Sequence, residues 1–128
     1  MKKILIIEDE KILADLLAKK LKEEGFEITQ AEDGVEGMKK IKEERPDLIL
    51  LDIVMPKKGG FEVLEEMQGS SELKNIPVIV ISNSGQPVEI SRALELGVKD
   101  YLIKTQFDPE EVITKVKRQI GQSSDKAQ

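Results

Sequence analysis

The segment from Leu48 to Pro56, LILLDIVMP, places an aspartate inside an apolar run. An unpaired carboxylate is costly to bury, so Asp52 must lie where the chain reaches the surface or beside a cation that compensates its charge. Other polar residues also follow directly on short aliphatic runs: Glu8 and Asp9 after KILII, Ser82 after VIVI, and Lys104 after YLI. Carboxylates, a hydroxyl and an amine in such places are suited to hold a hard cation and a phosphoryl group.

Five aliphatic runs are predicted to form strands, at residues 3–7, 26–31, 47–52, 78–81 and 101–103. Segments with apolar residues at helical spacing separate these runs, and one more follows the last of them. The apolar positions that define these helices are Leu13, Leu16, Leu17 and Leu21, then Val35, Met38 and Ile41, then Phe61, Leu64 and Met67, then Ile90, Ala93 and Leu94, and finally Val112, Ile113, Val116 and Ile120. This alternation predicts a doubly wound α/β fold, a parallel sheet with helices on both faces.

Local signals mark the ends of the predicted helices. Gly25 stands where a left-handed C-terminal cap is expected, and Asp33 with Glu36 has the spacing of a capping box. Asp108 followed by Pro109 is a helix start, with an N-cap residue and a proline in the first turn. These signals fall between the predicted strands, as the alternating fold requires.

The polar residues at the strand ends are expected to converge. In a parallel sheet all carboxyl ends lie at one edge, and ligands of doubly wound folds bind there. Three carboxylates would repel one another unless a hard cation lay between them, which favours Mg²⁺. Lys104 could then pair with a phosphoryl oxygen, Ser82 could donate to another, and Asp52 could act as the nucleophile. Each residue alone is more often a helix cap, a turn residue or a solvated lysine, so the joint arrangement carries the prediction.

Composition restricts the chemistry. A chain of 128 residues with a formal net charge of −5 forms one domain, and its acidity argues against direct binding of nucleic acid. Histidine and cysteine are both absent, which removes imidazole and thiolate chemistry. The first apolar run is too short for a signal peptide or a membrane span, so we expect a cytoplasmic protein with no membrane insertion. Residues 121–128 have no apolar periodicity and are expected to form a flexible tail.

From Lys2 to Ile120 the sequence resembles the receiver domain of bacterial two-component response regulators, in the single-domain form of the chemotaxis regulators. The resemblance implies a flavodoxin-like sheet of strand order 2-1-3-4-5 and a receiver domain over residues 1–120. It also implies that Glu8, Asp9 and Asp52 bind Mg²⁺ together with the backbone carbonyl of Val54. Asp52 would be the phosphoacceptor.

The same resemblance assigns roles to three residues of the last two strands. Ser82 and Lys104 match the positions that contact the phosphoryl group, and Tyr101 matches the aromatic position that moves together with Ser82 when the domain switches. The implied function is a phosphorylation-dependent switch. It would take its phosphoryl group from a phosphohistidine of a sensor histidine kinase or phosphotransfer protein. The surface of the fourth helix, fifth strand and fifth helix would then bind a downstream protein target. Such a domain assists its own phosphorylation and dephosphorylation and is not a turnover enzyme.

Three positions depart from the family pattern. Thr105 stands where a proline with a cis peptide bond commonly follows the lysine, so the resemblance leaves the direction of Lys104 and the geometry of the Lys104–Thr105 peptide open. Asn83 replaces a residue that is usually small and frames access to the phosphorylation site. Gly59 replaces a frequent Asp or Asn, a change expected to affect only its loop.

The same residues bear on three alternative functions. A phosphatase of the haloacid-dehalogenase type wants a second aspartate two positions after the nucleophile, where this chain has Val54. A nucleotide-binding loop would need glycines where the first strand opens into Glu8-Asp9-Glu10. A receiver-like module that binds partners without phosphorylation stays open, because Asn83 and Thr105 depart from the pattern. With one domain only, the chain is expected to act by binding another protein.

Overall fold

The computed structural model describes residues 1–55, 57–105 and 108–120, and the predicted tail at residues 121–128 lies outside this range. Its centre is a five-stranded sheet of order β2-β1-β3-β4-β5 in which each neighbouring pair is parallel. The strands are β1 (Lys3–Ile7), β2 (Glu27–Ala31), β3 (Leu48–Asp52), β4 (Val78–Ser82) and β5 (Asp100–Ile103). The predicted fold class and strand order are confirmed, and the strand ends differ from the predicted ones by one residue at most.

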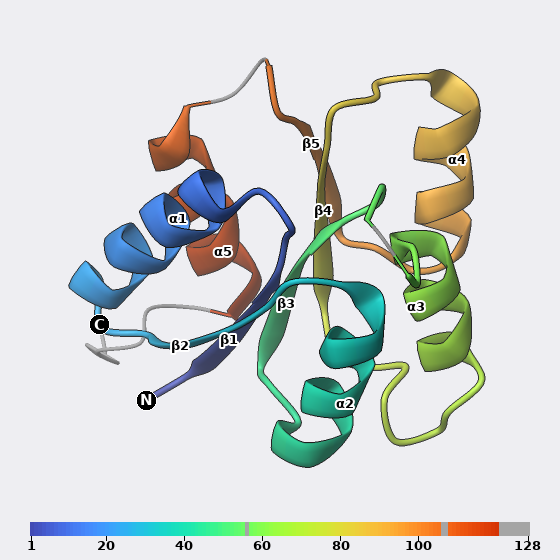
Figure 1. Ribbon diagram of the computed structural model, residues 1–128, viewed down its shortest axis with the longest axis horizontal. Helices are drawn as coiled ribbons and strands as arrows, with labels where there is room; N and C mark the ends of the chain where they lie inside the picture. Colours follow the sequence, from blue (N-terminus) through green and yellow to red (C-terminus); the bar gives the residue numbers. More distant parts are fainter. Residues whose placement is uncertain (56, 106–107, 121–128) are drawn as a thin grey trace.

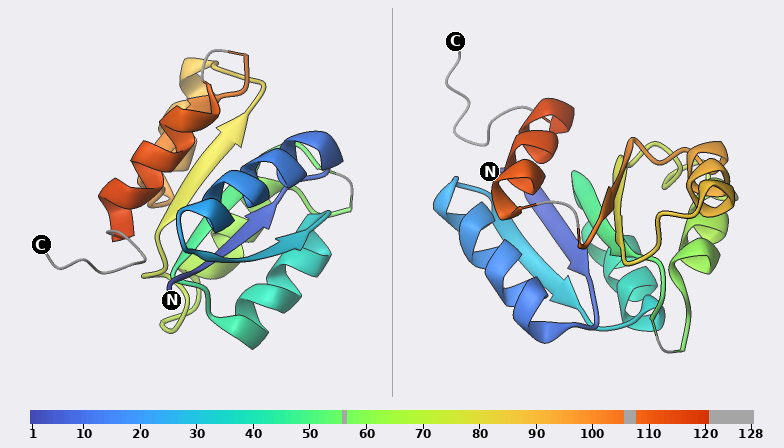
Figure 2. Two further views of the ribbon diagram at one scale, coloured as in Figure 1. Left: turned by 90° about the vertical axis from the view of Figure 1, so that its left-hand side faces the viewer. Right: turned by 90° about the horizontal axis from the view of Figure 1, so that it is seen from above.

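Helices cover both faces of the sheet (Figures 1 and 2). They are α1 (Lys11–Glu23), α2 (Gly34–Glu44), α3 (Gly60–Gln68), α4 (Pro87–Glu95) and α5 (Pro109–Ile120). α1 and α5 pack on one face, and α2, α3 and α4 lie on the other. Among the described residues, no helix has both the length and the apolar character needed to cross a membrane.

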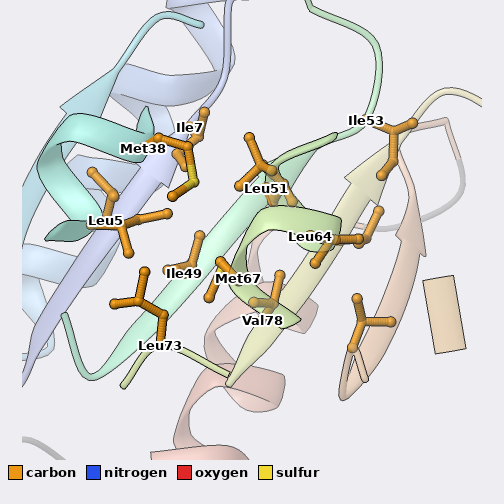
Figure 3. Close-up of a cluster of buried hydrophobic side chains, with 14 of the residues drawn as sticks. Leu5, Ile7, Met38, Ile49, Leu51, Ile53, Leu64, Met67, Leu73 and Val78 are labelled. Carbon is orange, nitrogen blue, oxygen red and sulfur yellow. The ribbon is translucent and has the colours of Figure 1, made fainter. Parts of the chain in front are cut away.

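Each face of the sheet has its own hydrophobic core, because side chains alternate between the faces along a strand. In β3, Leu48 and Leu50 belong to the core under α1 and α5, whereas Ile49 and Leu51 belong to the core under α2 and α3. Figure 3 shows this second core, in which Leu5, Ile7, Met38, Leu64 and Met67 gather around Ile49 and Leu51. A strand buried on both sides must be apolar at nearly every position, which accounts for the continuous aliphatic runs.

The helix ends follow the local signals, with one difference. Gly25 has a positive φ of 96°, as a left-handed cap requires, and Asp108 Oδ1 accepts a hydrogen bond from the Glu111 N–H at 3.1 Å. Asp33 Oδ1 accepts from the Glu36 N–H at 2.8 Å, which is half of the predicted capping box. The other half is displaced: the Glu36 carboxylate accepts from the Glu32 N–H, one residue before the N-cap.

Three apolar residues expected in the buried stripes are instead exposed. Val35 is 56% exposed, Leu94 53% and Leu16 39%. In α2 the buried face runs through Gly34, Gly37, Met38 and Ile41 instead. A Cβ atom on Gly37 would lie 2.7 Å from Ile7 Cδ1, so the glycine allows the helix to approach β1 closely and turns Val35 toward the solvent.

Candidate functional site

The candidate site is built by residues at the carboxyl edge of the sheet. Asp52 is the last residue of β3, Glu8 follows β1, and Lys104 follows β5. Side chains two positions apart in a strand point to the same face of the sheet. Glu8, Asp52 and Lys104 therefore lie on the face that also carries Ile6, Leu50 and Leu102. The sheet therefore directs two acids and one amine to the same face, although they are far apart in sequence.

Lys104 connects the acids of the site. Its Nζ lies 2.9 Å from Glu8 Oε2, 3.2 Å from Asp52 Oδ2 and 2.8 Å from Glu10 Oε2. The side chains of Lys104, Glu8 and Asp52 are only 7%, 3% and 4% exposed. Asp52 is thus tolerated as a buried residue with a cation beside it, and it does not reach the surface.

Burial and ion pairing shift the pKa values of these groups in opposite directions. Burial raises the pKa of Glu8 to about 7, although the hydrogen bonds that Glu8 accepts from the Glu10 N–H and from Lys104 lower it. Burial also raises the pKa of Asp52, and the charge of Lys104 acts against this shift. For Lys104, burial alone lowers the pKa, but the hydrogen bonds to Glu10 and Glu8 outweigh burial and raise it. Lys104 is therefore the permanent cation of the site.

Glu8, Asp9 and Asp52 form a group that fits a hard metal ion. Each offers a carboxylate oxygen, and these oxygens lie within 4.8 Å of one another. Among the described residues, Glu8 Oε1 is buried without a hydrogen-bond partner, so an oxygen of the group is left for a ligand. Asp9 is exposed, which leaves one side of the group open to water molecules. An all-oxygen donor set with room for water suits Mg²⁺ or Mn²⁺.

The loop after β3 is held close to the site. The Val54 N–H donates to Asp52 Oδ1 at 3.3 Å, while Val54 as a whole is 71% exposed. At the start of α3, a Cβ atom on Gly60 would lie 2.5 Å from the Asp52 carbonyl oxygen. The Gly59 N–H donates to Glu62 Oε1 at 2.9 Å. Gly60 therefore allows the close turn into α3, whereas a Cβ atom on Gly59 would come no closer than 3.4 Å to a neighbour. The Val54 carbonyl as a metal ligand stays a prediction.

Ser82 and Tyr101 lie on the other face of the sheet. Ser82 is fully buried and, by alternation, follows Val78 and Val80 into the core of α2 and α3. Its Oγ accepts from the Ser84 N–H at 3.2 Å, and the Tyr101 hydroxyl donates to the Ser84 carbonyl at 2.8 Å. Burial raises the pKa of Tyr101. Ser84 thus joins the two predicted switch residues to one another.

Two departures from the family pattern can now be located. No peptide bond among the described residues is cis, so the Lys104–Thr105 peptide is trans. The Lys104 N–H extends the sheet ladder by donating to the Ser82 carbonyl at 2.8 Å, and its side chain still reaches Asp52. The direction of Lys104, which the sequence left open, is therefore toward the site. Asn83 is exposed beside the buried Ser82.

Glu10 is a site residue that the sequence interpretation missed. In the sequence it argues only against a phosphate-binding loop, yet in the structure it is one of the three carboxylates that contact Lys104. A signal for it exists in the sequence, because residues two apart in extended backbone point to the same side. Glu8 and Glu10 have this spacing, and the N–H of Glu10 also donates to Glu8 Oε2 at 2.9 Å.

Comparison with known proteins gives consistent matches. The family model described as the response regulator receiver domain matches residues 4–117. Among solved structures, the chemotaxis protein CheY4 of Vibrio cholerae is 27% identical with a TM-score of 0.86, and the match covers 94% of this chain and 99% of that one. The Mn²⁺-bound form of the response regulator Rcp1 is 32% identical with a TM-score of 0.82, over 91% and 92% of the two chains.

A third solved structure bears on the metal group. The receiver domain of the sensor histidine kinase PA1611 from Pseudomonas aeruginosa has a magnesium ion coordinated in its active-site cleft. It is 25% identical to this chain with a TM-score of 0.83, and the match covers 94% of this chain and 98% of that one. Proteins similar to this chain therefore include one with Mn²⁺ and one with Mg²⁺ bound.

Proposed function

Because the chain belongs to the response regulator receiver domain family of two-component systems, we propose that it is a signalling switch in which Asp52 accepts a phosphoryl group. One observation carries the proposal. Asp52 ends the central strand β3 with Lys104 Nζ at 3.2 Å, and its carboxylate belongs to the group formed with Glu8 and Asp9. The site therefore combines a nucleophile, a fixed cation and an oxygen-donor set.

The proposed reaction transfers a phosphoryl group from a phosphohistidine of a sensor histidine kinase or phosphotransfer protein. A carboxylate oxygen of Asp52 attacks phosphorus, the new O–P bond forms as the P–N bond breaks, and the electron pair of that bond leaves with the imidazole. Lys104 would favour the ionised form of Asp52 before the attack and pair with a phosphoryl oxygen after it. Mg²⁺ bound to Glu8, Asp9, Asp52 and the Val54 carbonyl would neutralise part of the phosphoryl charge.

The proposed response runs from the phosphoryl group through Ser82 to Tyr101. Ser82 would donate to a phosphoryl oxygen, and this movement would release the contacts that Ser84 makes with Ser82 and with the Tyr101 hydroxyl. Tyr101 lies on β5 next to α4, so its rearrangement would change the surface formed by α4, β5 and α5, which we propose binds the downstream protein target. Receiver domains are generally phosphoacceptor switches and not turnover enzymes. The cytoplasmic location and the absence of nucleic-acid binding stay predictions.

Intact mass spectrometry tests the proposal directly. The protein is incubated with acetyl phosphate and Mg²⁺, with EDTA in a parallel sample, and an Asp52→Asn variant is treated in the same way. We expect one phosphoryl group on the wild type, and none on the variant or without the metal ion. Borohydride trapping and peptide mapping of the wild type locate the modified residue independently of any variant. No adduct on the wild type at any donor concentration would favour the phosphorylation-independent binding module.

A further inference from the structure

Lys104 has one more carboxylate partner than the proposed reaction uses. A lysine ammonium group has three N–H donors, and here they face three carboxylates: Glu8 at 2.9 Å, Asp52 at 3.2 Å and Glu10 at 2.8 Å. Glu8 and Asp52 belong to the metal-binding group, but Glu10 does not. Its contact with Lys104 is nevertheless the shortest of the three.

Glu10 also differs from the other two partners in its surroundings. Its side chain is 52% exposed, whereas those of Glu8 and Asp52 are 3% and 4% exposed. It is the N-cap residue of α1 and makes no side-chain cap hydrogen bond there, so capping does not account for its position. The side chain reaches from the surface to a lysine that is itself 7% exposed.

The three contacts imply a competition for Lys104. A cation bound by Glu8, Asp9 and Asp52 would lie beside the two buried carboxylates that contact Lys104, and its charge would repel the ammonium group. As these two contacts weaken, Glu10 is the one carboxylate of the three that lies outside the metal-binding group and can still hold the ammonium group. A phosphoryl group on Asp52 would then compete with Glu10 for the N–H groups of Lys104.

We propose that Glu10 is a positioning residue that retains Lys104 while Glu8 and Asp52 bind the metal ion, and that competes with the phosphoryl group for the same lysine. This inference rests on the proposed function, because it concerns the proposed phosphoacceptor site. It predicts that loss of the Glu10 carboxylate has opposite effects on two steps. Metal binding should weaken, because Lys104 is left with only the metal-binding acids, whereas phosphorylation of the metal-saturated protein should become faster.

The test compares Glu10→Gln with the wild type in two measurements. Calorimetric titration with Mg²⁺, without any phosphoryl donor, is expected to give an affinity about two- to fivefold lower for the variant, the range of a partly exposed ion pair. The rate of phosphorylation by acetyl phosphate at saturating Mg²⁺, followed by intact mass, is expected to rise by a similar factor of about two to five. A general structural defect would lower both, so the opposite signs identify the competition.

Two further variants separate contact from charge. Glu23→Gln removes the same charge from an exposed position at the far end of α1 and should leave both measurements unchanged. Glu10→Asp keeps the charge but is one methylene shorter, so it should behave like Glu10→Gln if contact with Lys104 matters. Thermal unfolding of each variant checks that the fold is retained.

The outcomes decide between the inference and its rivals. A Glu10→Gln variant that matches the wild type in both measurements, or that is phosphorylated more slowly, would overturn the inference. A Glu10→Asp variant that behaves like the wild type would show that charge alone acts and would also overturn it. If the wild type accepts no phosphoryl group at all, the proposed function fails, and an unchanged Mg²⁺ affinity in Glu10→Gln would then refute the metal-binding half separately.

Discussion

Lys104 and its carboxylate partners show how this chain buries charge. Removing one member of a buried ion pair is strongly destabilising, because the other charge is left uncompensated. Here the lysine faces two buried acids, and burial raises the pKa of both Glu8 and Asp52. The site is therefore under electrostatic strain without a metal ion, as expected of a group arranged for a ligand and not for stability.

This strain predicts a pH dependence of the metal-free protein. The pKa of Glu8 rises from its ordinary value of 4.5 to about 7 on folding. Between these values the folded protein holds a proton that the unfolded chain has lost, so the free energy of unfolding should decrease as the pH rises through this window. One buried carboxyl group shifted this far contributes a decrease of about 3 kcal/mol.

The measurement is urea unfolding in EDTA at a series of pH values from about 5 to about 8, chosen to span the shifted pKa. Glu8→Gln is the matched control, since it removes the titrating group and keeps the side-chain volume. Its stability should decrease less than that of the wild type over the same range. A wild-type stability that rises with pH in this window, or a variant with the same decrease, would contradict the predicted shift.

At the scale of elements, close packing between α2 and its neighbours depends on glycine. Gly34 begins α2, and a Cβ atom there would lie 2.1 Å from the Lys58 carbonyl oxygen in the loop after β3. Because the nearest atom belongs to the backbone, rotation of a side chain cannot relieve this contact. The first turn of α2 and the loop that follows Asp52 are thus fitted to one another.

Gly34→Ala is therefore expected to destabilise the protein, although alanine is the better helix former. Overpacking of this kind costs about 1 to 3 kcal/mol, which chemical denaturation would detect. Gly69→Ala is the matched control, because its Cβ atom would have no neighbour closer than 3.6 Å. That variant should be neutral or slightly more stable, since alanine reduces the freedom of the unfolded chain. Equal stability of the two variants would argue against the packing explanation.

The whole molecule is a sheet between two cores, with its charged group at one edge. The strands β1, β3 and β4 supply side chains to both cores, so the edge is held by elements that are buried on each side. A ligand that binds only the folded protein adds its binding free energy to the stability of the entire domain. Occupation of the metal group should therefore be visible in global unfolding.

Mg²⁺ is expected to raise the unfolding temperature in a concentration-dependent manner, with a stabilisation of about 2.7 kcal/mol at a hundred times the dissociation constant. Asp9→Asn should reduce this effect without loss of stability in EDTA, because Asp9 is exposed and its removal relieves repulsion among the acids. Differential scanning calorimetry with and without Mg²⁺ measures both. An Asp9→Asn variant stabilised as much as the wild type would exclude Asp9 as a ligand.

Much of the fold was predictable from the sequence, because its signals are local. Aliphatic runs, helical spacing and cap residues such as Gly25 and Asp108 specify elements within a few residues of themselves. The parallel order then brings the strand ends to one edge, so Glu8, Asp52 and Lys104 could be grouped before any contact was known.

The contacts that depend on distances between separate segments were decided only by the tertiary structure. Residue type and spacing predicted that Val35 is buried. In the structure α2 approaches β1 so closely that Gly37 lies against the strand, and Val35 is exposed instead. Likewise, nothing local distinguishes Glu10 from a surface acid, because its partner Lys104 follows it by 94 residues. The sequence by itself determined which groups stand at the sheet edge, since hydrogen bonding and alternation act along the chain. Packing across space determined which of them are paired, buried or left for a ligand.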